Sequence, residues 1–230
     1  MARLSRYYIK NQPQHIIQRG INQQDIFFDE VDYQYYIDCL YAAAYNNDLK
    51  VHAYVLMPNQ VNLLVSPGEE NSISRTLQSL GRNYAQHFND NYDNQGALWE
   101  GRYRATVLDP SEYLLRCSRY IENSPVRAGL TKNPKAYQWS SYAHNALGKA
   151  DESITEHRIY KQLGKTEKER SQAYRALFKP TLTAEELTTI SDATNKGWAL
   201  GNAKFIKKIE QLTNRRASPL PKGRPKKTKT

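Results

Sequence analysis

The sequence is poor in cysteine and has no long apolar run. Its 230 residues include only two cysteines, Cys39 and Cys117. Two are too few for a disulfide framework or a cysteine metal site, and they suit a reducing cytoplasm. No segment approaches the roughly 20 apolar residues that cross a bilayer, and the N-terminus has no apolar core like that of a signal peptide. We therefore expect a soluble cytoplasmic protein with no membrane partner.

Phenylalanine is also scarce, whereas tyrosine is abundant. There are 5 Phe and 17 Tyr residues, and hydrophobic residues make up 39% of the chain. This apolar share is enough for a core and excludes global disorder, while the length fits one or two domains of roughly 100–200 residues each. Tyrosine suits half-buried packing and base stacking alike. We expect packing to account for most of the tyrosines.

Acidic residues are nearly absent from the C-terminal segment. The chain carries a net charge of +10, and residues 202–230 hold ten Lys or Arg against the single acid Glu210. That segment alone therefore carries +9, and residues 1–201 carry +1. Such an imbalance favours a polyanionic partner, although a simply solvated tail is the alternative.

The hydrophobic periodicity predicts an α+β fold. Strands are expected at 15–19, 49–56, 61–65 and around 107, with helices at about 31–46, from about 72, and from 110 to about 123. The first six of these elements follow the ferredoxin-like order, with an antiparallel sheet and helices on one face. We expect one domain over residues 1–148. A small helical region over residues 149–230 follows and ends in a basic tail from about residue 202.

Several segments together resemble one protein family. They are HIIQRG at 15–20, HAYVLMPNQVNLL at 52–64, LWEGRYRATV at 98–107, RYIENSPVRAGL at 119–130, WSSY at 139–142, GWALG at 197–201 and KGRPKK at 222–227. In this order they are similar to the REP-associated tyrosine transposases, relatives of the single-tyrosine insertion-sequence transposases of the HUH nuclease superfamily. The resemblance runs over nearly the whole chain.

The resemblance implies a transposase and endonuclease that cuts single-stranded DNA hairpins in repetitive extragenic palindromes. In this family two histidines flanking one hydrophobic residue hold Mg²⁺ or Mn²⁺, and a residue one helical turn past the nucleophilic tyrosine completes the metal site. The tyrosine forms a 5′-phosphotyrosine bond during strand transfer and DNA recombination. The metal neutralises the scissile phosphate, and the tyrosine must lie in line with it.

The family's nucleophile corresponds to Tyr120, but its metal positions hold Gln60, Asn62 and Ser124. These side chains offer only neutral oxygens, which bind Mg²⁺ weakly without a carboxylate. Three interpretations remain open at this stage. The chain is a catalytically impaired DNA binder, or an enzyme with a weakly held, hydrated metal, or a form changed to trap bound DNA.

The other candidate residues are assigned to packing or to DNA binding rather than to a step of the reaction. His52, near the metal positions in the sequence, is expected to be a packed histidine. Phosphate contacts are expected from arginines in or beside the matched segments and from a tail that resembles an AT-hook core. These residues are Arg19, Arg102, Arg104, Arg116, Arg119, Arg127, Lys222, Arg224, Lys226 and Lys227.

Two classes of function therefore compete. One is a DNA strand transferase, favoured by the retained Tyr120. The other is a non-catalytic DNA-binding or regulatory protein, favoured by the replaced metal ligands. An RNA-binding ferredoxin-like domain is disfavoured because no strand carries the aromatic pattern of such domains. We expect a monomer or dimer associated with the nucleoid.

Overall fold

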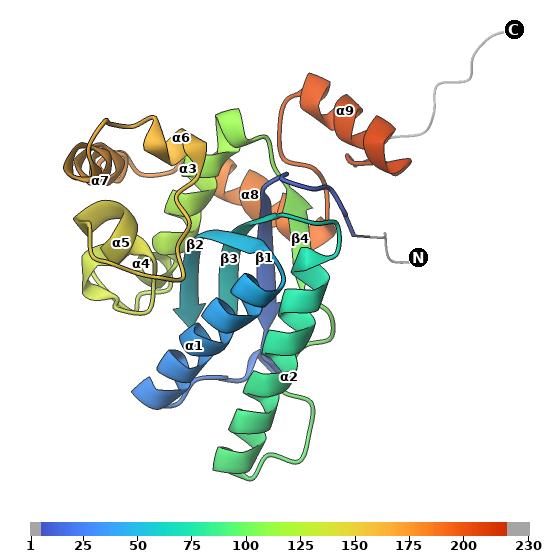
Figure 1. The fold of residues 1–230 in the computed structure, drawn as a ribbon, viewed down its shortest axis with the longest axis vertical. Helices are drawn as coiled ribbons and strands as arrows, with labels where there is room; N and C mark the ends of the chain where they lie inside the picture. Colours follow the sequence, from blue (N-terminus) through green and yellow to red (C-terminus); the bar gives the residue numbers. More distant parts are fainter. Residues whose placement is uncertain (1–5, 220–230) are drawn as a thin grey trace, which may run out of the picture.

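A computed structural model describes residues 6–219, in which a four-stranded sheet lies between two layers of helices (Figure 1). The strands are β1 (Gln14–Arg19), β2 (Leu49–Met57), β3 (Gln60–Pro67) and β4 (Arg104–Val107). Their order in the sheet is β2-β3-β1-β4, and each neighbouring pair is antiparallel. This order is that of the ferredoxin-like arrangement, so the predicted α+β fold is confirmed.

The helices and short turns complete the chain. The α-helices are α1 (Glu30–Asn46), α2 (Ser72–Tyr92), α3 (Pro110–Glu122), α4 (Ser124–Arg127), α5 (Tyr142–Leu147), α6 (Arg158–Lys161), α7 (Glu167–Ala176), α8 (Ala184–Lys196) and α9 (Ala203–Thr213). Two 3₁₀ turns occur at Ile21–Gln23 and Pro134–Ala136. Across residues 6–219, no helix has the length and apolar character that a membrane span needs.

Helices α1 and α2 cover one face of the sheet, as the sequence predicts. Asp29 begins α1 because its carboxylate accepts hydrogen bonds from Val31 N and Asp32 N. The fully buried Tyr36 and Tyr84 pack edge to face between the two helices, with ring centroids 5.0 Å apart. Eight of the 17 tyrosines are buried and five more are half-buried, so packing is the main use of this residue.

Helices α3 and α8 cover the other face, which the sequence does not predict (Figure 1). Asp109 begins α3, since its side chain accepts from Ser111 N, and Pro110 at the first helical position needs no partner for an N–H. The core between this face and the two helices contains Ala53, Val55, Met57, Leu64, Leu114, Cys117, Ile121, Ile190 and Ala193. The sheet therefore has two buried faces rather than one.

The C-terminal segment is packed beside β4 rather than extended. Leu200 N donates to Val107 O, and Asp109 N donates to Leu200 O. Phe205 and Ile209 of α9 are buried against Tyr7. Residues 203–213, which the sequence assigns to the start of a basic tail, therefore form a docked helix. The tail positions Lys222, Arg224, Lys226 and Lys227 lie outside the described residues.

Contacts also cross the expected boundary between residues 148 and 149. The buried Glu122 carboxylate accepts a hydrogen bond from the Tyr174 hydroxyl at 2.7 Å. His15 Nδ1 lies 2.8 Å from Thr194 Oγ1, which links β1 to α8. Residues after 149 thus contribute to the core and to the face of the sheet that carries the site described next.

Candidate nucleic-acid site

Strands β1 and β3, which lie side by side in the middle of the sheet, provide the polar floor of the site. Arg19 faces Gln60 in the register, and Ile17 faces Asn62. Because alternate residues of a strand share a face, His15 and Arg19 lie on the same side as Gln60 and Asn62. This is the side covered by α3 and α8.

Tyr120 lies near the end of α3 over this floor. Its half-buried ring is 5.6 Å from the ring of His15, and the guanidinium of Arg127 lies 4.2 Å from the ring centroid on one side. The Arg127 guanidinium also interacts with the Tyr120 hydroxyl, by charge and by a side-chain hydrogen bond. The predicted nucleophile and the family's metal positions are therefore brought to one place by elements far apart in the sequence.

The first two metal positions are already bonded to protein groups. Gln60 Oε1 accepts a hydrogen bond from Arg19 Nε at 3.2 Å. Asn62 Oδ1 lies 3.2 Å from His15 Nε2 and is buried. Each amide oxygen has a partner, and the partner of Gln60 is itself a cation.

The third position, Ser124, is bonded in the same way. Its hydroxyl donates to Tyr120 O at 3.0 Å and accepts from Arg127 Nη2 at 2.8 Å. The three potential metal ligands are therefore neutral oxygens. Each is hydrogen-bonded to a protein group, and two of them are bonded to guanidinium groups.

Mg²⁺ and Mn²⁺ favour carboxylate oxygens, and nearby positive charge opposes their binding. These residues do not fit the divalent metal that the family implies. Residues 6–219 also hold no cluster of three or more His, Cys, Asp or Glu suited to a metal ion.

His15 is a site residue that sequence reasoning did not assign. It is fully buried, and burial lowers its pKa to about 4, with the charges of Arg127 and Arg19 acting in the same direction. The imidazole is therefore neutral at neutral pH, and both of its nitrogens face partners, Thr194 and Asn62. His15 lies four residues before Arg19 on β1, and strand alternation therefore puts both side chains on the same face of the sheet. This spacing was the one signal in the sequence that could have identified His15.

Two of the predicted phosphate-binding arginines meet beside Tyr120. Arg19 Nη2 and Arg104 Nη1 donate to the same atom, Asn195 Oδ1, at 3.1 and 3.2 Å. Burial lowers the pKa of Arg19 and the Arg104 charge lowers it further, while Glu100 and the Tyr120 hydroxyl act in the opposite direction. Arg104, Glu100 and Tyr120 therefore all lie close enough to Arg19 to affect its pKa.

The remaining predicted arginines are placed differently. Arg116 lies 3.8 Å from a Glu112 oxygen and 3.7 Å from a Glu186 oxygen, and Arg119 donates to Pro180 O. Both therefore have structural partners outside the Tyr120 site. Arg102 is exposed in the loop before β4.

His52 is a packed histidine, as the sequence predicts. It is buried, with Nδ1 2.6 Å from Thr155 O and Nε2 2.9 Å from Ser66 Oγ. Burial lowers its pKa to about 4. Since both nitrogens are used in this way, His52 has no role as a metal ligand.

Comparison with known proteins places this arrangement in a family. The family model described as "Transposase IS200 like" matches residues 8–124, which include β1 to β4 and all of α3. The chain belongs to the IS200-like transposases. No curated protein matches it.

Two solved structures are similar to this transposase-family chain to different degrees. A REP-associated tyrosine transposase bound to a REP hairpin is similar with a TM-score of 0.54 at 17% identity, over 68% of this chain and 93% of that one. A putative transposase from Deinococcus radiodurans R1 gives a TM-score of 0.38 at 23% identity, over 53% of this chain and 97% of that one. The first match supports the assignment of the fold.

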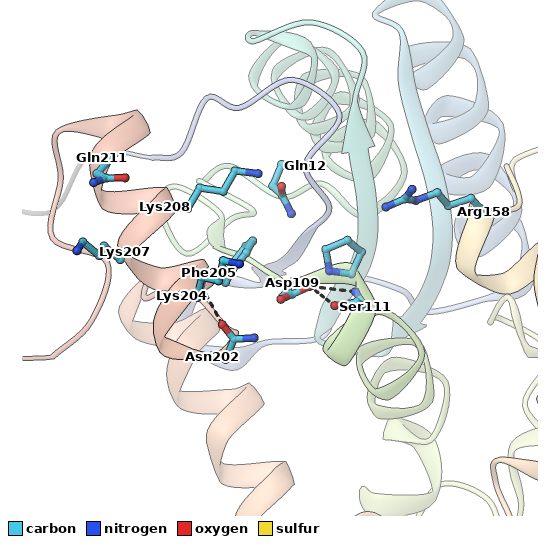
Figure 2. A pocket seen from close by; sticks show the side chains of 11 residues that line it. Gln12, Asp109, Ser111, Arg158, Asn202, Lys204, Phe205, Lys207, Lys208 and Gln211 are labelled. Carbon is cyan, nitrogen blue, oxygen red and sulfur yellow. Dashed lines mark hydrogen bonds between the residues drawn. The ribbon is translucent and has the colours of Figure 1, made fainter.

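A second basic feature of this transposase-family chain lies at the other end of α3. A groove of about 720 Å³ is formed between α9, the start of α3 and α6 (Figure 2). Lys204, Lys207 and Lys208 line it from α9, and Arg158 points toward it from the opposite side. These four side chains are exposed, and among residues 6–219 none of them forms an ion pair. Their positive charge is therefore available to an anionic ligand.

Proposed function

We propose that this transposase-family chain binds single-stranded DNA folded into a hairpin and that its strand-cleaving activity is lost or strongly reduced. The observation that carries the proposal is the Tyr120 site. Tyr120 stands at the nucleophile position that the resemblance implies, with arginines beside it, whereas Gln60, Asn62 and Ser124 are neutral and bonded to the protein. DNA of the cytoplasmic nucleoid would be the partner, bound by a monomer or a dimer.

The arrangement of positive charge supports a single strand as the ligand. The Tyr120 site has Arg19, Arg104 and Arg127 around a half-buried aromatic ring. The basic groove begins at Ser111, nine residues before Tyr120 on α3. Nine residues of helix span about 14 Å. A strand that contacts both places would run along α3, and its phosphates would meet guanidinium or ammonium groups at each end.

A second function, slow strand cleavage by Tyr120, is favoured by one observation. Tyr120 is half-buried beside the neutral His15, and the guanidinium of Arg127 lies 4.2 Å from its ring centroid and interacts with its hydroxyl. A hydroxyl placed in this way is able to meet a phosphate. The two functions differ in whether the unmodified chain cuts DNA.

Hairpin recognition is tested by affinity. The full chain is expected to bind a palindromic single strand more tightly than an unstructured strand of equal length, measured by fluorescence anisotropy at physiological salt. Base pairing in the palindrome presents a fixed backbone shape, which an unstructured strand must adopt at an entropic cost. Equal affinity for the two strands would leave only a general basic binder and would contradict the proposal.

The basic groove is tested by salt dependence. Changing Lys204, Lys207 and Lys208 together to glutamine is expected to lower the slope of log affinity against log salt by about 0.7 for each lost phosphate contact. The loss should be similar for all DNA sequences, because phosphate contacts do not read bases. The matched control changes three exposed lysines outside the groove, Lys132, Lys135 and Lys179. If both triple variants lower the slope equally, the groove has no special role.

A further inference from the structure

Two positive charges converge on one neutral atom in the Tyr120 site. Asn195 Oδ1 accepts from Arg19 Nη2 at 3.1 Å and from Arg104 Nη1 at 3.2 Å. The nearest carboxylate is that of Glu100, 3.5 Å from Arg104 Nη2, and both of these side chains are well exposed, so this pair contributes little. Like charges held together in this way repel each other, and an anion placed between them would relieve the repulsion.

The guanidinium groups also retain free donors. Each guanidinium carries five N–H groups. Arg19 uses Nε for Gln60 and Nη2 for Asn195, and Arg104 uses Nη1 for Asn195 and Nη2 for Glu100. Within residues 6–219 the other N–H groups of both arginines have no acceptor. Planar groups with spare parallel donors match the oxygens of a phosphodiester, which they bind in pairs.

Arg19 also lies at a position where the resemblance implies the metal cation. Arg19 Nε bonds to Gln60, the first metal position, and the Tyr120 hydroxyl interacts electrostatically with Arg19. A positive charge is thus fixed at the metal position by the protein itself.

We propose that Arg19 and Arg104 form a phosphate-binding site that holds the backbone of the bound strand beside Tyr120 without any divalent cation. Asn195 positions the two guanidiniums, because its neutral oxygen brings them together without neutralising them. This inference rests on the proposed function, since it names the contact that the strand makes. It assigns a role in the site to α8, which lies outside the segment matched by the family model.

The deciding experiment compares Asn195→Asp with Asn195→Ala in the full chain. Aspartate keeps the size of the side chain and gives the two arginines a carboxylate, so it neutralises the site and occupies its donors. Alanine removes the clamp but leaves both positive charges. We expect Asn195→Asp to weaken binding of a single-stranded hairpin roughly tenfold or more and to lower the salt slope by about 0.7. Asn195→Ala should bind more tightly than Asn195→Asp.

The order of the two variants separates binding from structure. If Asn195 only stabilises the fold, aspartate, which can bond to both arginines, would be the milder change and alanine the more harmful one. Asn83→Asp, at an exposed position on α2 across the sheet, is the matched control for the added negative charge. Thermal unfolding of each variant confirms that it is folded. Wild-type affinity and slope in Asn195→Asp, or a larger loss in Asn195→Ala, would overturn the inference.

A second measurement addresses the cation. The wild-type affinity for the hairpin is expected to be the same in EDTA as in millimolar Mg²⁺ or Mn²⁺. A gain of about tenfold or more with either ion would show a bound metal and overturn the inference. If the wild type binds no single-stranded DNA, the proposed function fails as well. If the wild type binds and Asn195→Asp binds equally, only the arginine site fails.

Discussion

The unmodified chain is expected to leave hairpin-forming single-stranded DNA uncut, even in millimolar Mg²⁺ or Mn²⁺. A metal that neutralises the scissile phosphate contributes several kcal/mol to such a transition state. Each 1.36 kcal/mol is about tenfold in rate, so its loss should cost at least several hundredfold. The structure gives the reason for the loss, since the oxygens of Gln60, Asn62 and Ser124 already bond to the protein. Single-turnover cleavage of a labelled strand measures the rate.

Restoring the metal ligands that the family implies is the complementary gain-of-function experiment. Gln60→His, Asn62→His and Ser124→Asn together are expected to recover cleavage. Both histidines would lie on the face of β3 below Tyr120, on the same strand side as the present side chains. Tyr120→Phe in the restored chain should abolish cleavage again, because the phenolic oxygen is the nucleophile.

Two results would contradict this account. Efficient cleavage by the unmodified chain that depends on Tyr120 would favour a hydrated metal held by Gln60 and Asn62. If the restored variant stays inactive although it binds Mn²⁺, the loss lies deeper than the metal ligands. The guanidinium of Arg19, bonded to Gln60, is then the next group to change. Cleavage is read from the same assay, and Mn²⁺ binding by the restored variant is measured separately.

Glu122 is expected to contribute a fall in the free energy of unfolding as the pH rises from about 4.5 to about 7, opposite in sign to the contributions of the buried His15 and His52, whose lowered pKa values favour the folded state as the pH rises. This carboxyl is fully buried at the end of α3. Burial raises its pKa from 4.5 to about 7, and hydrogen bonds from Ser141, Asn145 and Tyr174 oppose the shift. A raised pKa means that the folded state holds the proton more tightly than the unfolded state. The contribution is complete below pH 4.5 and is lost as the pH passes 7, to a total of about 3 kcal/mol.

Glu122→Gln should remove this contribution and leave those of His15 and His52 in place, so the difference between the two proteins isolates Glu122. Glutamine keeps an oxygen for Ser141 Oγ and Asn145 Nδ2, and it carries no charge at any pH. The variant should therefore gain about 3 kcal/mol on the wild type between pH 4.5 and pH 8, measured by urea unfolding across that range. Glu112→Gln, on the half-exposed part of the same helix, is the control. Parallel curves for the wild type and Glu122→Gln would mean that Glu122 is not the group responsible.

Much of the fold could be predicted because its elements carry local signals. Alternation marked β2 and β3, and the Met57-Pro58-Asn59 turn separated them. Asp109 with Pro110 marked the start of α3. The apolar spacing of α1 and α2 indicated the face that they bury. These features depend on neighbours a few residues apart, so the sequence alone was sufficient for them.

The site was predicted in part for the same reason. Strand alternation places Gln60 and Asn62 on one face, and helical spacing places Ser124 one turn after Tyr120. The chemistry of these side chains, three neutral oxygens in place of metal ligands, also follows from the sequence. It was the resemblance to the tyrosine transposases that assigned these positions, and residue type then showed that the metal ligands are replaced.

The partners of those side chains were decided only by the tertiary structure. His15 contacts Thr194, which is 179 residues away in the chain. Arg19 and Arg104 both contact Asn195, which is 176 residues from the first and 91 residues from the second. No local period encodes such distances, because the contacts form only when α8 packs on the second face of the sheet. A separate cluster, in which Phe205 and Ile209 pack with Tyr7, holds part of the expected basic tail as α9. The sequence alone determined which oxygens replaced the metal ligands, and the long-range packing decided that arginines and a histidine would engage them.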